Sequence, residues 1–153
     1  MLLVTNTFFP RTVRVVGGAL GAAFGVPFIA AGTSPSASGT ALIAGLAMLV
    51  IGGVLGARFA PRAVRPGVRS AFATSALVTA FAVPLGAISV AASMATNAGP
   101  PFAPEAIVGV LALAAIGLIF LGLPMAGLTF VAANVWVALV RFAARRLIAA
   151  STR

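Results

Sequence analysis

Four long apolar runs that contain no charged residue determine most of what this chain can fold into. They cover residues 15–31, 41–57, 71–95 and 106–140. A helix needs about 20 consecutive apolar residues to cross the hydrocarbon core of a membrane, and in lipid it must satisfy its own backbone polar groups. We therefore predict an all-α, polytopic membrane protein with four transmembrane helices, which form a single transmembrane domain over residues 1–153.

The composition excludes most catalytic chemistry. Of the 153 residues, 61% are hydrophobic and 7% are charged, whereas soluble domains carry about 25% charged residues. The chain has no Cys, His or Asp, and its one acidic residue is Glu105. It therefore lacks thiolate and imidazole ligands for a metal or haem, and it has no acid–base pair. We predict that the protein is not an enzyme and has no cofactor or metal site.

All ten arginines lie on one side of a four-span arrangement. Two precede the first run, four lie in the connection 58–69 and four follow the last run, whereas 32–39 and 96–104 contain none. Because cationic loops stay in the cytoplasm, both termini are predicted to be cytoplasmic. We expect a multi-pass protein of the plasma (inner) membrane of a bacterium or archaeon, inserted by an uncleaved signal anchor.

A formal charge of +9 would suggest nucleic-acid binding in a soluble protein. The positions of the arginines instead indicate contact with anionic lipid headgroups on the cytoplasmic side of the membrane. No nucleic-acid partner is expected. The cations predicted to contact headgroups or a partner protein are Arg58, Arg62, Arg65, Arg69, Arg141, Arg145 and Arg146.

The fourth run is too long for one straight crossing. Its 35 residues would form a helix about 52 Å long, against about 30 Å of hydrocarbon. Splitting it near 122–127 would give five spans and place four arginines outside, so the charges favour four spans. The run must then tilt, kink at Pro124 or include a re-entrant segment.

Two sequence matches suggest an internal repeat. The pattern A-L-x-x-A-F-x-V-P occurs at 19–27 and again at 76–84, and 58–62 resembles 141–145 in the same order. We therefore predict two tandem helical hairpins, with repeats at 13–62 and 68–146. Transporters often contain such repeats, but simple duplication of a stable hairpin is the favoured interpretation.

Small residues mark the faces expected to pack closely. Glycines spaced by four allow two helix backbones to approach each other in lipid, and the arrangement is known as a glycine zipper. The partner is either another helix of this chain or a different subunit. The predicted helix-packing residues are Gly17, Gly21, Gly25, Gly52 and Gly56.

The third run carries a stripe of small and hydroxyl-bearing residues on one helix face. We consider two interpretations, a wall of a polar path or a packing seam whose hydroxyls bond to backbone carbonyls, and favour the seam. The residues are Ser75, Thr79, Gly86, Ser89 and Ser93, together with Ala82 and Thr96.

Other polar and proline residues have simpler predicted roles. Pro27, Pro84 and Pro124 should kink their spans. Asn134 is expected to bond to another helix. Glu105 should complement the N-terminal dipole of the fourth helix, with an outer-side ion pair as the alternative.

The leading functional prediction is a non-catalytic accessory or scaffold subunit of a larger integral membrane complex, whose partners are other membrane protein subunits. The alternative is a small channel or transporter for an uncharged or weakly polar solute. A third hypothesis is a lysis or stress protein that oligomerises through its glycine faces.

Overall fold

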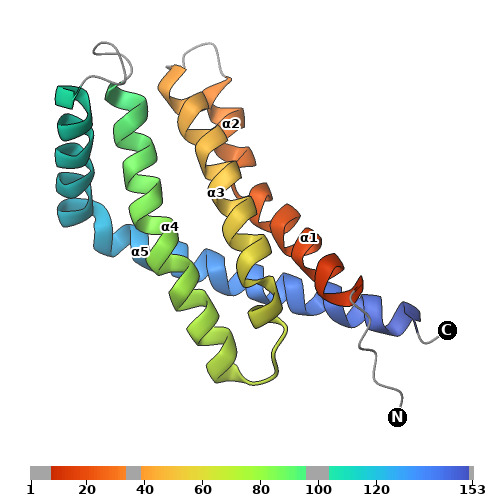
Figure 1. Ribbon diagram of the computed structural model, residues 1–153. Helices are drawn as coiled ribbons and strands as arrows, with labels where there is room; N and C mark the ends of the chain where they lie inside the picture. Colours follow the sequence, from red (N-terminus) through yellow and green to blue (C-terminus); the bar gives the residue numbers. More distant parts are fainter. Residues whose placement is uncertain (1–7, 34–38, 96–103, 152–153) are drawn as a thin grey trace.

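The computed structural model describes residues 8–33, 39–95 and 104–151, and these are almost entirely helical (Figure 1). The prediction of an all-α fold is confirmed for this part of the chain. The helices are α1 (Phe8–Ala23), α2 (Val26–Gly32), α3 (Gly39–Ala63), α4 (Val68–Ala95) and α5 (Pro104–Ser151).

Three of these helices are long and apolar enough to cross a membrane. The candidate spans are Leu42–Ala63 in α3, Val68–Met94 in α4 and Ile107–Ala150 in α5. They are compatible with a multi-pass membrane protein. A fourth crossing would have to be made by α1 and α2 together, because α1 has only 16 residues and α2 only 7.

The first apolar run is divided between Ala23 and Val26, just before Pro27. Pro27 has no N–H to donate to the carbonyl of Ala23, and its ring collides with that carbonyl in a regular helix. The chain turns instead, with Phe24 N–H donating to Gly21 O (3.3 Å) and Gly25 N–H to Ala22 O (2.8 Å). Where a kink was predicted, the structure has a break between two helices.

The other two prolines leave their helices unbroken. Pro84 lies inside the 28-residue α4, and Pro124 lies inside the 48-residue α5. Figure 1 shows that α5 bends strongly between its teal and blue parts. We call residues 104–123 the N-terminal limb of α5 and residues 124–151 its C-terminal limb. The overlong fourth run is thus a single bent helix, which is one of the three solutions that the sequence left open.

A glycine makes the tight connection between α3 and α4. Gly67 has a φ of +102°, a backbone conformation that residues with a Cβ rarely adopt. Arg65 N–H donates to Arg62 O (3.1 Å), and the hydroxyl of Ser70 donates to the same carbonyl (3.2 Å). These bonds satisfy the end of α3 and bring α4 back alongside it.

The helices associate as two pairs that the C-terminal limb of α5 joins. In the first pair, α1 and its continuation α2 pack against α3. In the second pair, α4 packs against the N-terminal limb of α5. The two pairs meet where α3 contacts α4. The C-terminal limb then crosses towards α1, and the end of α5 lies near the start of α1 (Figure 1). The prediction that these pairs arose by duplication stays a prediction.

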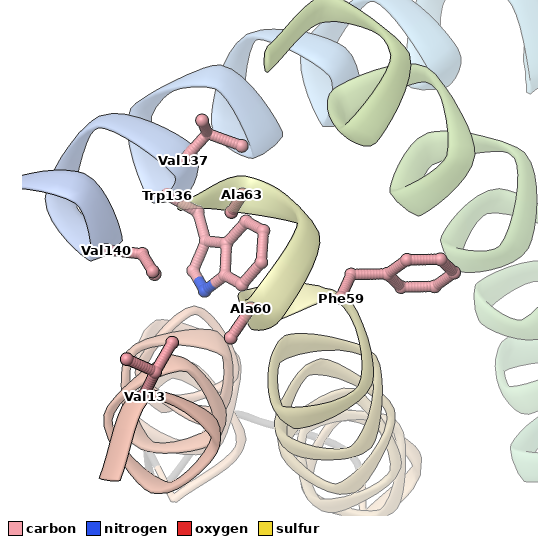
Figure 2. Packing of buried hydrophobic residues seen from close by; sticks show 7 residues of the cluster. All are labelled: Val13, Phe59, Ala60, Ala63, Trp136, Val137 and Val140. Atoms are coloured by element: carbon pink, nitrogen blue, oxygen red, sulfur yellow. The ribbon is translucent and has the colours of Figure 1, made fainter. Parts of the chain in front are cut away.

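The main buried cluster lies at the arginine-bearing end of the molecule. Figure 2 shows the indole of Trp136 among side chains from α1, α3 and α5. The cluster consists of Val13, Phe59, Ala60, Ala63, Trp136, Val137 and Val140. This end of the helices is therefore closed by the C-terminal limb of α5.

Candidate functional site

The glycines predicted to pack closely lie where α1 and the turn after it contact α3. This chain therefore supplies both sides of the contact. A Cβ on Gly21 would overlap the carbonyl of Gly52, and one on Gly56 would overlap the carbonyl of Gly17. A Cβ on Gly25 would lie 2.6 Å from the backbone of Leu49. The two backbones therefore touch along α1 and into the turn after it.

Two polar side chains form hydrogen bonds that join the C-terminal limb of α5 to the first helix pair. The indole Nε1–H of Trp136 donates to Gly17 O (3.0 Å). Arg141 donates from Nε to Ala63 O (2.7 Å), and from Nη2 to Arg65 O (2.8 Å) and Gly67 O (3.0 Å). A cation at the C-terminal end of α3 also complements the dipole of that helix.

Of the seven arginines assigned to headgroup or partner contact, Arg141 is thus turned towards its own chain. The guanidinium of Arg62 lies 6.0 Å from the ring centroid of Phe59, and that of Arg146 lies 5.1 Å from that of Phe142. The other six arginines of this set are exposed: Arg58, Arg62, Arg65, Arg69, Arg145 and Arg146.

The stripe on α4 does not form a continuous polar surface. The hydroxyl of Ser89 donates to Leu85 O (2.8 Å) and that of Ser93 to Val90 O (2.7 Å), both within α4. The hydroxyls of Ser75 and Thr79 are buried and have no hydrogen-bond partner among the described residues. Gly86 faces α3, where its Cβ would lie 2.7 Å from Met48 Cε.

Asn134 bonds within its own helix, contrary to the interhelical bond expected from the sequence. Its Nδ2 donates to Phe130 O (2.8 Å), one turn earlier in α5. Glu105 lies in the first turn of α5, but its side chain is outside the described residues. The predicted ion pair on the outer side therefore stays a prediction.

A large apolar groove is the feature that sequence reasoning missed. It has a volume of about 590 Å³ and lies between α1 and α3 on one side and α4 and α5 on the other. Its lining contains Thr129 as the sole hydroxyl and no charged residue. The lining residues are Gly21, Phe24, Met48, Ile51, Gly52, Leu55, Gly56, Val78, Ala82, Val83, Gly86, Ala87, Val90, Ala91, Met94, Leu113, Ala114, Gly117, Leu118, Leu121, Gly122, Met125, Leu128, Thr129, Ala132, Ala133 and Trp136.

The groove exists because α5 bends and because small residues line it. The N-terminal limb contributes Ala114 and Gly117, and the C-terminal limb contributes Ala132, Ala133 and Trp136. The excess length of the fourth apolar run was the sequence signal for a bend, but the position of the limbs depends on contacts with three other helices. Of the α4 stripe, Ala82 and Gly86 line the groove, whereas its described hydroxyl-bearing members do not.

The chain matches no protein-family model, no curated protein and no solved structure.

Proposed function

We propose that this protein is a non-catalytic accessory subunit of a larger integral membrane complex, with four crossings and both termini in the cytoplasm. The observation that carries the proposal is the exposure of α5. Only 6% of its most apolar window is buried within the chain, against 22% for α3 and for α4. A helix so little covered by its own chain offers a face to other subunits.

The exposed face lies mainly on the N-terminal limb of α5. Ile119, Phe120 and Leu123 are 77%, 76% and 86% exposed. A Cβ on Gly109, which does not line the groove, would meet no atom within 4 Å. Because association in lipid depends on close backbone approach at small residues, an open glycine on the same limb as these large apolar side chains supports docking of a partner helix here.

The same geometry gives less support to the other two hypotheses. A channel needs polar groups along a path, but Ser89 and Ser93 bond to carbonyls of α4 and the groove is apolar. The hypothesis of a hole-forming oligomer depends on the glycine faces of α1 and α3, and these already contact each other.

The exposed arginines support the proposed orientation. Each can interact with anionic headgroups at about 1 kcal/mol. The chain has no Cys, so Val68→Cys, at the exposed start of α4, and Ser36→Cys give single reporters. We expect a membrane-impermeant maleimide to label Ser36→Cys in intact cells and to label Val68→Cys only after lysis. Labelling of Val68→Cys in intact cells would contradict the orientation.

Purification in mild detergent followed by mass spectrometry tests the accessory role. We expect larger membrane proteins to co-purify in stoichiometric amounts, and recovery as a free homo-oligomer would contradict the proposal. A photocrosslinking residue at Leu123 should capture the same proteins. The matched control is Val54 on α3, which is 62% exposed and should capture much less.

A further inference from the structure

The apolar groove has the chemistry of a site for one hydrocarbon chain. Its volume of about 590 Å³ lies within the range of roughly 300–1,000 Å³ that is typical of small-ligand pockets. Its walls are aliphatic side chains and glycine or alanine surfaces, such as Gly52, Ala87 and Gly117. A polar solute would find almost no hydrogen-bond partner there.

The C-terminal limb of α5 obstructs a straight transmembrane helix in this groove. The limb lies across one end, where Ala133 and Trp136 line the groove. A straight helix would collide with this limb, whereas a flexible chain can end against it.

The length of the groove suits an acyl chain. Along α4 its lining runs from Val78 to Met94, a rise of about 24 Å at 1.5 Å per residue. We propose that the groove binds one acyl chain of a membrane phospholipid, with the methyl end beside Trp136 and the headgroup beyond Met94. Because no charged residue lines the groove, zwitterionic and anionic phospholipids should bind similarly.

Trp136 provides the measurement, since it is the chain's single tryptophan and the chain has no tyrosine. The whole chain, purified in detergent, is titrated with phosphatidylcholine brominated near the methyl end of one acyl chain. We expect saturable quenching of Trp136 fluorescence at one lipid per protein. Lipid brominated near the headgroup should quench less, because its bromines would lie at the other end of the groove.

A matched pair of variants separates binding in the groove from contact with bulk lipid. A Cβ on either Gly117 or Gly109 would meet nothing within 4 Å, so neither substitution clashes at its Cβ. Gly117 lines the groove and Gly109 does not. Gly117→Phe should raise the apparent dissociation constant about tenfold, the change expected from losing contact with about two methylene groups. Gly109→Phe should leave it unchanged.

The proposal would be overturned by quenching that never saturates, or by equal quenching curves for Gly117→Phe and Gly109→Phe. A partner polypeptide that protects Trp136 from quenching in the wild type but not in Gly117→Phe would also overturn it, by identifying a protein occupant. The titration uses the isolated chain, so its outcome is independent of whether larger membrane proteins co-purify.

Discussion

The glycines of α1 and α3 and those of α5 have opposite surroundings. A Cβ on Gly21 or Gly56 would overlap backbone atoms of the opposite helix, whereas one on Gly109 or Gly127 would meet nothing within 4 Å. The residue type is the same, but the spacing differs. Glycines spaced by four form one continuous face that this chain uses itself, and irregularly spaced glycines in α5 leave gaps that the chain does not fill.

The largest expected effect comes from adding a side chain where two backbones touch. Gly21→Leu would overlap the carbonyl of Gly52, and the overlap is relieved only when α1 and α3 move apart and lose their close contact. We expect destabilisation of about 3 kcal/mol or more, at the upper end of the cost of overpacking. Thermal unfolding in detergent, followed by Trp136 fluorescence, measures it.

Gly109→Leu is the matched control, because it makes the same change where the chain leaves open space. It should not destabilise the isolated protein, because the side chain enters open space and the loss of glycine flexibility favours the helix by up to about 1 kcal/mol. If both variants lost equal stability, the distinction between the two sets of glycines would fail.

The second effect concerns the attachment of α5 to the first helix pair. Arg141→Gln removes a guanidinium that donates to three carbonyls at the end of α3 and in the turn after it. Since hydrogen bonds to charged groups contribute about 1.5–3 kcal/mol each, we expect a loss of about 2–3 kcal/mol after partial compensation by water. Thermal unfolding measures the loss. The control is Arg145→Gln, at an exposed position on the same limb, which should change the stability by less than about 0.5 kcal/mol. Comparable losses in the two variants would mean that Arg141 acts only as one of many surface charges.

A smaller effect is expected at the other point of attachment. Trp136→Phe keeps an aromatic ring in the buried cluster but removes the N–H that donates to Gly17 O. We expect a loss of about 1–2 kcal/mol from the hydrogen bond and the smaller ring. Circular dichroism measures it, because this variant has no tryptophan. A variant as stable as the wild type would show that the indole hydrogen bond does not hold the C-terminal limb.

The sequence predicted the parts of the fold that depend on composition and local pattern. Apolar runs predicted the long helices, and the spacing of Gly17 and Gly21 identified a contact face. The sequence could not predict which proline breaks its helix, because that outcome depends on the packing of other helices around each proline. The helix breaks before Pro27, beside a close approach to α3 at Gly25, but continues through Pro84.

The groove was beyond prediction for a related reason. Its lining comes from α1, α3, α4 and both limbs of α5, so it depends on the angle at which α5 bends. That angle is determined by contacts distant in sequence, such as those of Arg141 with the α3–α4 connection. A single hydrophobic pattern along α5 carries no information about them.

The smallest effect is the change in stability on replacing a glycine by alanine, and its sign should differ between α5 and the α1–α3 contact. Gly109→Ala adds a methyl group to open space and reduces the flexibility of the unfolded chain, so it should stabilise the isolated protein by about 0.5–1 kcal/mol. Gly52→Ala makes the same change against the carbonyl of Gly21 and should destabilise it. Paired thermal unfolding curves measure both signs. If a partner helix docks at the N-terminal limb of α5, Gly109→Ala should also reduce co-purification while raising stability, because a methyl group keeps the partner backbone at a distance. A variant that gained stability and kept its partners in full would place the docking face elsewhere on α5.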